Sequence, residues 1–246
     1  MANHTSFETG GEPLQRRITA GLEKVALALR QASRRGAGRS GLTPTQGLIL
    51  TVLRRHPAGQ RLSMIAATLG VTRASASQTI STLARKGLVT THPAAGDGRA
   101  RCIVLAPRGR REAARALSWG ETVDAAVDTL DPAEQVVLLR ALVKIIRALQ
   151  EAGQIAPSRM CVTCRYFRPH VHADPLRPHH CAFVDAAFGD RALRVDCPDH
   201  MPAPAADAAR TWKAFVRTAN QRMRLHPMYD ARPQQNRRTG VSSCRR

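Results

Sequence analysis

The chain has 246 residues, of which 38 are Lys or Arg and 18 are Asp or Glu, giving a formal net charge of +20. Hydrophobic residues make up 43% of the sequence, which excludes a wholly disordered polycation, and no apolar run approaches the length of a membrane-spanning helix. The basic balance predicts an anionic partner, most simply nucleic acid. Because the first residues form no apolar signal core, we expect a cytoplasmic protein that does not engage a membrane.

The charge and the metal-ligating residue types are unevenly distributed along the chain. Residues 1–150 hold 22 basic and 10 acidic side chains, residues 151–202 hold 6 of each, and residues 203–246 hold 10 and 2. The neutral middle segment nevertheless contains four of the six cysteines and five of the nine histidines. This contrast predicts a basic helical domain over 12–152, a Cys-rich segment over 157–202, a helix over 203–226 and a disordered basic tail over 227–246.

The first half of the chain shows helical periodicity interrupted by glycines. One apolar stripe predicts a first helix that ends at Gly36, Gly38 and Gly41, and it consists of Leu14, Ile18, Leu22, Val25 and Leu29. Thr43 is the expected cap of a second helix with Pro44 at its first position. A short helix over 62–69 follows, and Gly70 closes it.

The next stretch predicts a helix, a hairpin and two more helices. Thr72 caps a helix that ends at Gly87 and turns Ala76, Ile80 and Leu83 inward. Residues 88–92 and 101–105 are β-prone, and the Ala-Gly-Asp-Gly turn between them predicts a hairpin. Helices are expected over 108–128 and 132–150, the second capped by Asp131.

This order of elements is typical of a winged helix-turn-helix, a mostly α fold with a small β-hairpin wing. The segments LSMIAATLGVTRASASQTISTLARKGLV and GDGRARCIVLAPRG resemble the MarR family of bacterial transcription regulators, with Ala106 replacing the Thr usual at the strand exit. The motif resemblance covers residues 62–109, and the element order extends it to 12–150. It implies a homodimer formed by the terminal helices, which pairs the 14–29 and 132–150 stripes, and binding to double-stranded DNA.

The predicted recognition helix carries polar and basic residues opposite its buried stripe. The major groove admits one helix, and short polar side chains and Arg read its base edges. Ser77, Gln78 and Ser81 are the candidate base readers; Arg73 is expected to reach a base or a phosphate, and Arg85 lies on the same face. Without the wing that follows, these residues would indicate only a solvated helix face.

The predicted wing carries the second set of DNA-binding candidates. Arg99 and Arg101 fall on one strand face at the hairpin tip, where a wing reaches the minor groove and its negative potential attracts Arg. Asp97 would hold Arg99 in position, or the pair would only stiffen the hairpin. Three further arginines are either flanking phosphate contacts or plain surface charge: Arg54, Arg55 and Arg61.

The cysteine segment has the spacing C-x2-C-x16-C-x15-C, formed by Cys161, Cys164, Cys181 and Cys197. A CxxC turn presents two thiolates to one metal ion. A bound metal would also stabilise the fold of a small, net-neutral segment. The alternatives are a redox disulfide in the CxxC pair or buried thiols. The spacing resembles that of high-potential iron–sulfur proteins, which favours a [4Fe–4S] cluster. Zn²⁺ is the alternative, with His200 as a substitute ligand.

Together these features predict a DNA-binding transcription regulator that responds to redox or iron status through a metal centre held by the four cysteines. The alternative is a repressor released by a small phenolic effector in the dimer cleft, with the Cys segment a structural zinc module. An Arg-rich RNA-binding protein is a further alternative. No Gly-rich phosphate loop, nucleophile motif or paired carboxylates point to catalysis, so we do not expect an enzyme.

Overall fold

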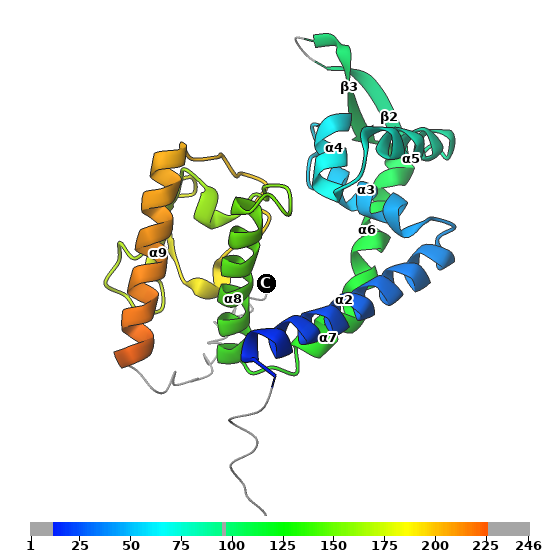
Figure 1. The fold of residues 1–246 in the computed structure, drawn as a ribbon. Helices are drawn as coiled ribbons and strands as arrows, with labels where there is room; N and C mark the ends of the chain where they lie inside the picture. Colours follow the sequence, from blue (N-terminus) through cyan, green and yellow to red (C-terminus); the bar gives the residue numbers. More distant parts are fainter. Residues whose placement is uncertain (1–11, 95–96, 226–246) are drawn as a thin grey trace, which may run out of the picture. The chain divides into compact units, whose positions relative to one another are not determined.

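The computed structural model describes residues 12–94 and 97–225, apart from the side chains of 94, 97–100 and 218–225. The chain divides into two compact units (Figure 1). The first unit comprises Met1–Leu130, Val143–Arg159 and Val195–Asp199, as far as these are described. The second unit comprises Asp131–Leu142, Met160–Arg194 and the described residues from His200 onward.

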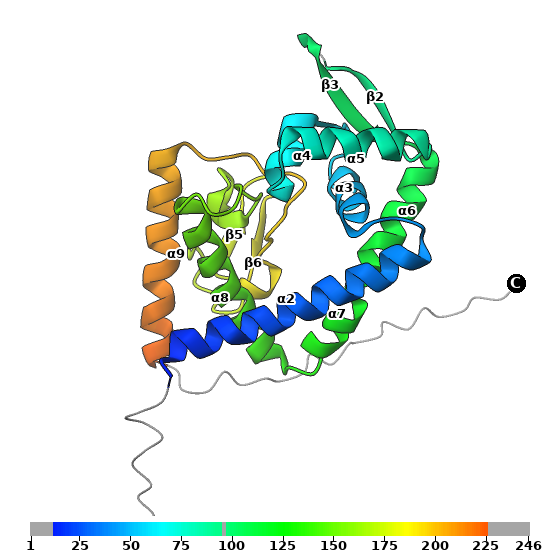
Figure 2. The same ribbon diagram turned by 45° about the vertical axis from the view of Figure 1, so that its right-hand side comes forward.

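The first unit is a helical domain with one small sheet. Its sheet is antiparallel in the order β1–β3–β2, and β1 was not expected from the sequence. Figure 2 shows α7 alongside α2, the longest helix of this unit. Its elements are α2 (Leu14–Arg39), α3 (Pro44–Arg54), β1 (Gln60–Arg61), α4 (Leu62–Leu69), α5 (Arg73–Arg85), β2 (Val89–Ala94), β3 (Asp97–Leu105), α6 (Pro107–Leu117) and α7 (Glu121–Val127).

The predicted helix starts are confirmed by explicit caps. Thr43 Oγ1 accepts the backbone N–H of Gln46 at 3.2 Å, and the Gln46 side chain accepts the Thr43 N–H at 3.2 Å, so α3 begins with a capping box. Thr72 Oγ1 accepts the N–H of Ser75 at 3.1 Å at the start of α5. Gly70, at φ +63°, closes α4 in the left-handed conformation that glycine adopts without strain.

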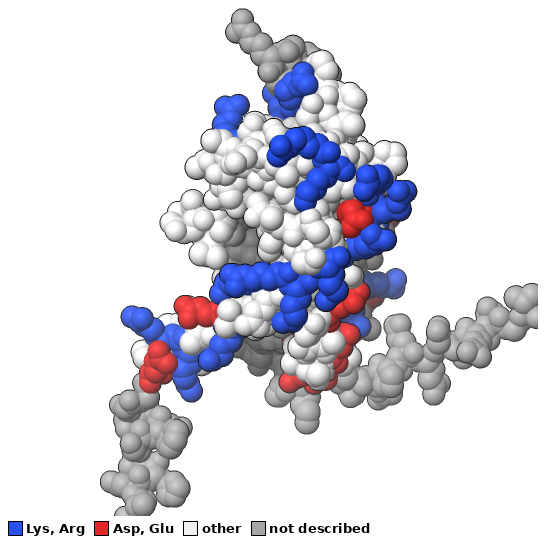
Figure 3. Space-filling view, turned by 90° about the vertical axis from the view of Figure 1, so that its right-hand side faces the viewer, with Lys and Arg blue, Asp and Glu red and all other residues white. Residues whose placement is uncertain are grey.

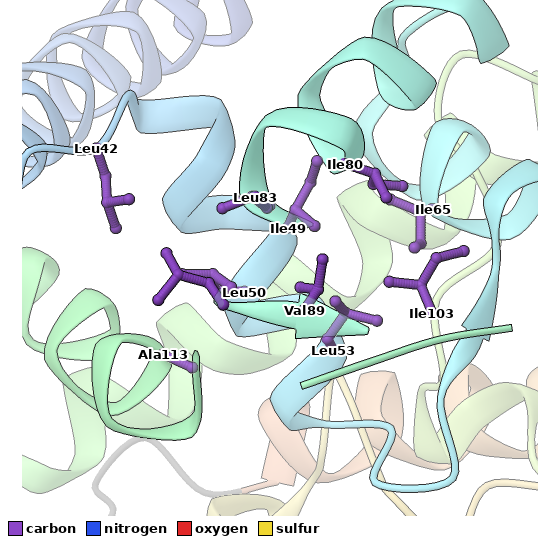
Figure 4. Packing of buried hydrophobic residues seen from close by; sticks show 11 residues of the cluster. Leu42, Ile49, Leu50, Leu53, Ile65, Ile80, Leu83, Val89, Ile103 and Ala113 are labelled. Atoms are coloured by element: carbon purple, nitrogen blue, oxygen red, sulfur yellow. The ribbon is translucent and has the colours of Figure 1, made fainter. Parts of the chain in front are cut away.

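An aliphatic core holds these elements together (Figure 4). α3 contributes the most deeply buried side chains, and α5 adds the inward stripe predicted from the sequence. The cluster consists of Leu42, Ile49, Leu50, Leu53, Ile65, Ile80, Leu83, Leu88, Val89, Ile103 and Ala113. Burial of this apolar surface is the main force that positions α5 and the hairpin against each other.

The predicted end of the first helix is wrong at two of its three glycines. α2 continues through Gly36 and Gly38 to Arg39, and only Gly41, at φ +62°, adopts the left-handed conformation. Gly36 is needed for packing, because a Cβ there would lie 2.3 Å from the ring of Trp119. A Cβ at Gly47 of α3 would lie 2.1 Å from the same ring. The two glycines therefore make room for one tryptophan.

That tryptophan also explains why the expected helix over 108–128 is interrupted. α6 ends at Leu117, a single 3₁₀ turn covers Ser118–Gly120, and α7 begins at Glu121. The turn places the half-buried Trp119 against the two glycine positions and beside the aliphatic core. Packing of the indole ring thus outweighs the helical propensity of this stretch.

The second unit contains a small sheet that was not predicted from the sequence. The sheet is antiparallel in the order β4–β5–β6. α8 begins in this unit and continues beyond Leu142 in the first unit. Asp131 caps α8, since its carboxylate accepts the N–H of Glu134 at 2.9 Å. The elements are α8 (Pro132–Glu151), β4 (Phe167–Arg168), β5 (His179–Cys181), β6 (Ala186–Phe188) and α9 (Ala205–Leu225).

The core of the second unit is built from rings. Phe215 of α9 and His179 of β5 are fully buried, and their ring centroids lie 5.8 Å apart. Phe167 packs edge-on against both, at 5.9 Å from Phe215 and 5.3 Å from His179. Aromatic pairs at such separations stabilise a fold beyond their buried area.

A buried ion-pair network lies beside these rings. His179 Nε2 is 2.8 Å from Asp190 Oδ1, and the guanidinium of Arg140, on α8, bonds the other carboxylate oxygen. Arg140 also lies over the ring of Phe215, 5.3 Å from its centroid. Burial alone raises the pKa of Asp190, but the His179 hydrogen bond and the charge of Arg140 outweigh it and hold that pKa below its usual value. The network therefore ties α8 to the sheet.

None of the described helices combines the length and the apolar character that crossing a bilayer requires.

Candidate nucleic-acid interface

The helix α5 presents one buried face and one exposed face. Ala76, Ile80 and Leu83 are buried, with at most 6% of their surface exposed. The opposite side of the helix carries Ser77, Gln78, Ser81 and Arg85, and Arg73 stands at the start of the helix; all five predicted contact residues are exposed. The structure therefore leaves the predicted recognition residues exposed, while the aliphatic core fixes the buried side of the same helix.

The five residues differ in their position along α5 and in their hydrogen bonds. Arg73 is the first residue of α5, directly after the Thr72 cap. Arg85 lies at the opposite end and donates to Thr82 Oγ1 at 3.3 Å, so its guanidinium lies along its own helix. Gln78 and Ser81 lie between these two ends, in the middle of the exposed face.

The hairpin predicted as a wing is present and longer than expected. β2 and β3 pair from Val89↔Leu105 to Ala94↔Asp97, with an irregularity between Pro93 and Ala94. Arg101 is exposed and donates to Thr91 Oγ1 at 3.0 Å across the hairpin. Asp97 and Arg99 belong to β3, but their side chains lie outside the part of the chain that the structure describes.

Basic side chains dominate the face of the first unit shown in Figure 3. They extend over the elements of the winged helix that lie on the right of Figure 1, with fewer acidic side chains between them. Arg54 and Arg61 are exposed at the end of α3 and in β1. Such a surface attracts a polyanion at long range, in agreement with the net charge of the chain.

Lys86 has a structural role that the sequence did not indicate. Its Nζ donates to the backbone oxygen of Gly41 at 2.7 Å and to Gln46 Oε1 at 3.1 Å. The lysine thereby links the end of α5 to the turn before α3. It also borders a pocket of about 390 Å³ lined by Ser40, Gly41, Leu42, Arg85, Lys86, Leu88, Arg108 and Glu112.

A second unexpected cluster lies at the end of α3. Asp196 bonds Arg55 Nη1 through Oδ2 at 2.7 Å and Arg159 through Oδ1 at 2.7 Å. Arg159 Nη1 lies 3.3 Å from His56 Nδ1. Burial, followed by the charge of Arg159, lowers the pKa of His56, so its ring accepts this bond in the neutral form. No sequence signal indicates this cluster, because Arg159 and Asp196 lie 103 or more residues beyond the end of α3 in the sequence.

The four predicted metal ligands are divided between the units. Cys161 and Cys164 form a tight turn in which the Cys164 N–H donates to the Cys161 oxygen at 2.9 Å, and the N–H of Arg194 donates to Cys161 Sγ at 3.2 Å. Cys181 lies in β5 of the same unit, whereas Cys197 belongs to the first unit.

Metal ligation by these residues stays a prediction. Within residues 12–94 and 97–225, no three His, Cys, Asp or Glu side chains gather into a group that could hold a metal ion. The suggested substitute ligand His200 lies 2.9 Å from Thr163 Oγ1 through its Nε2. The predicted basic tail over 227–246, including Cys244, lies outside the described residues.

Two helices joined at Gly70, a polar outer face on the second helix and a following antiparallel hairpin define a winged helix-turn-helix. Residues 40–100, about a quarter of the chain, match the family model described as MarR family. This match confirms, for that segment, the resemblance to the MarR family noted in the sequence. The cysteine segment lies outside the match.

Solved structures give further likenesses. The S. aureus MepR–DNA complex is 22% identical with a TM-score of 0.48, over 53% of this chain and 97% of that one. The transcriptional regulator SlyA is 22% identical with a TM-score of 0.49, over 55% and 95%. The repressor CouR bound to a 23-mer DNA duplex is 25% identical with a TM-score of 0.45, over 55% and 99%. The comparison with curated proteins gives no match.

Proposed function

We propose that this protein is a transcription regulator that binds specific sequences of double-stranded DNA, with α5 in the major groove. The observation that carries this proposal is the exposed face of α5. Its polar and basic side chains stand opposite a buried stripe, within the segment that matches the MarR family, and a hairpin follows. This arrangement suits a helix that enters a groove, because its inner face is already committed to the core.

Base reading is assigned to the middle of that face. Gln78 carries an amide that pairs with adenine through two hydrogen bonds, and the serine hydroxyls of Ser77 and Ser81 donate to or accept from either kind of base pair. Arg73 sits at the end of α5 that meets a groove first in this fold class. We assign Arg85 to a backbone phosphate, since its guanidinium lies at the far end of the helix.

Substitution of Gln78 tests the recognition helix. We expect Gln78→Ala to relax the preference at one base-pair position by about 1–3 kcal/mol and to leave the salt dependence of binding nearly unchanged. Selection from a random duplex library, followed by titration of the selected site, measures both. Gln154→Ala, an exposed glutamine beyond the end of α8, is the matched control. An equal loss of binding on every sequence would exclude Gln78 as a base reader.

The wing is tested by substitution of Arg99. If this side chain enters the minor groove, Arg99→Ala lowers operator affinity by about 1–3 kcal/mol without loss of thermal stability. Competition between duplex DNA and duplex RNA separates this function from RNA binding, because an RNA helix hides its major groove. Preference for the RNA duplex would overturn the proposal.

We further propose that the active form is a homodimer formed through α2 and α8. The stripe on α2 is strongly exposed in the single chain, from 37% at Leu22 to 61% at Leu14, and Val137 of α8 is 61% exposed. Exposed apolar stripes of this length favour burial in an interface. Leu22→Asp and Ile146→Asp should each produce monomers in sedimentation velocity, with the exposed Gln15→Asp as control. An unaltered dimer for both variants would place the interface elsewhere.

For the cysteine segment we propose one metal centre per chain, held by Cys161, Cys164, Cys181 and Cys197. The tight turn of the CxxC pair and the N–H···S bond to Cys161 support this proposal, because both are compatible with thiolate ligands. A [4Fe–4S] cluster would supply redox or iron sensing, and Zn²⁺ would make the segment a structural module. In the second case, release from DNA would depend on a small effector.

Metal analysis of anaerobically purified protein decides between these outcomes. A brown protein that absorbs near ~400 nm contains an iron–sulfur cluster, and a colourless one with one zinc per chain contains Zn²⁺. Each single Cys→Ser change at the four positions should lower the metal content, whereas Cys102→Ser and Cys244→Ser should not. Wild-type metal content in any of the four would remove that residue from the ligand set.

A further inference from the structure

The carboxylate of Asp196 occupies a binding site made of two guanidinium groups. One oxygen bonds Arg55 Nη1 at 2.7 Å, and the other bonds Arg159 through Nε and Nη2, each at 2.7 Å. The Asp196 and Arg159 side chains are 24% and 20% exposed, so the inner half of the site is shielded from water, whereas Arg55 is 51% exposed. Both oxygens of the acid are thus held by arginine.

This arrangement has the chemistry of a phosphate site. Guanidinium groups bind carboxylates and phosphates through the same charge-assisted N–H···O bonds, and a phosphodiester carries the same single negative charge as a carboxylate. Arg159 is further oriented by its Nη1 contacts with His56 Nδ1 at 3.3 Å and the Arg55 backbone oxygen at 3.4 Å. The cations are therefore already converged before any external anion arrives.

The location of the site links it to the winged helix. Arg55 is the C-cap residue of α3. The chain then continues to β1, which pairs with the wing strand β3 at Gln60↔Ile103 and Arg61↔Cys102. Asp196 reaches this place from 141 residues further along the sequence. A segment remote in sequence thus neutralises a basic residue next to the sheet of the wing.

We propose that Asp196 is an internal substitute for a DNA phosphate, which holds Arg55 and Arg159 until the DNA backbone displaces it. This inference rests on the proposed DNA-binding function. A half-exposed ion pair is weak, so it opens at little cost, and Arg55 then reaches a phosphate. Because the acid is tethered, it competes with DNA at a high effective concentration and lowers affinity for every duplex sequence.

The test is a titration of full-length protein with a duplex of random sequence. Asp196→Asn keeps the shape of the side chain and removes its charge. We expect it to tighten binding about three- to tenfold near physiological salt and to steepen the slope of log affinity against log salt by about one, the value of one extra phosphate contact. Unchanged or weaker binding by a folded Asp196→Asn variant overturns the proposal.

Two further variants separate the site from a general charge effect. Asp199→Asn makes the same charge change three residues away, at an exposed position that forms no ion pair with the described residues, and it should alter affinity less than twofold. Arg55→Ala should alter affinity little in the wild-type chain but should abolish the gain in the Asp196→Asn chain. Equal gains from both Asn variants, or a gain that survives Arg55→Ala, would show that Asp196 does not mask this arginine.

Retention on immobilised heparin separates a failure of this inference from a failure of the proposed function. Heparin is a polyanion that needs no operator and no major groove. A wild-type protein that binds heparin but no duplex DNA contradicts the proposed function. Later elution of Asp196→Asn than of Asp199→Asn then still supports the masked anion site, and equal elution of the two variants overturns it.

Discussion

The two units of this protein reach a stable core by different chemistry. The first unit packs aliphatic side chains from helices and a hairpin that follow one another in the sequence. The second unit packs rings and a buried histidine from the small sheet and α9 beside an ion pair between Asp190, in the turn after β6, and Arg140 of α8. A periodic aliphatic core can be recognised from local sequence, whereas a core assembled from single polar and aromatic residues far apart cannot.

The second unit also has a source of stability other than a metal ion in the cysteine segment. The sequence suggested that a segment over 157–202 needs a metal ion to fold, because it is too small and too charged for apolar burial alone. In the structure, Phe215 and Arg140 come from outside that range and supply a buried ring and a cation whose side chain is only 20% exposed. Folding of the segment therefore has a source of stability that does not involve the cysteines.

The largest expected effect is on the second unit. Asp190→Ala leaves the charge of Arg140 buried without its partner and removes the acceptor of His179, so we expect a loss of about 3–5 kcal/mol of stability. Faster amide hydrogen exchange in β5 and β6 measures it locally. The control is Asp185→Asn, because that side chain is 95% exposed although it also pairs with a histidine, and Asn tolerates the left-handed backbone at φ +50°. Similar losses for the two variants would contradict a special role for the buried network.

A core truncation gives the corresponding measurement for the first unit. Leu50 is fully buried in the aliphatic cluster, so Leu50→Ala should cost about 2–5 kcal/mol, measured by chemical denaturation. Leu48, on the same helix, is 50% exposed and serves as the control. We expect the exchange rates of β5 and β6 to stay unchanged. Equal acceleration there would show that the two cores unfold as one.

Low pH is expected to destabilise the second unit, by less than the two core substitutions above. The pKa of Asp190 is held below the ordinary value of 3.8, so the ionised form stabilises the folded state. This contribution is complete above the ordinary pKa and is lost as the pH falls through 3.8 toward the lowered value. Stability of the second unit should therefore fall over this range more steeply in the wild type than in Asp190→Asn. Parallel pH profiles would show that the network does not hold the acid in its ionised form.

The smallest expected effect concerns the start of α3. Thr43→Ala removes the side-chain acceptor for the Gln46 N–H and should destabilise the first unit by about 1 kcal/mol in thermal unfolding. Thr51→Ala is the control, since its hydroxyl bonds only the Leu48 oxygen within the same helix. No difference between the two would mean that Pro44 alone fixes the helix start.

The sequence predicted most of the first unit because each signal there is local. Thr43 and Thr72 cap their helices, Gly70 turns, and the inward stripe of α5 follows helical periodicity. Gly36 was wrongly predicted to end the first helix, since its role depends on a tryptophan 83 positions further along the chain. A glycine that breaks a helix and a glycine that admits a ring are indistinguishable without the partner.

The candidate site divides in the same way. The exposure of the candidate residues on α5 follows from the buried stripe of the same helix, which the sequence reveals, whereas their contacts with DNA stay a prediction. The cluster around Asp196 was missed, since ion pairs between residues 37 and 141 positions apart leave no local pattern. The sheet β4–β5–β6 was missed because its strands have only two or three residues, too few for an alternating pattern.

The packing of Trp119 against two glycines has a practical consequence. The sequence contains two tryptophans, and each unit holds one: Trp119 in the first and Trp212 in the second. Replacing either by phenylalanine leaves a single intrinsic fluorophore in the other unit. The emission wavelength and quenching of each single-tryptophan protein then report separately on one unit, without any attached dye. Tryptophan fluorescence can therefore show whether a change in one unit also alters the other.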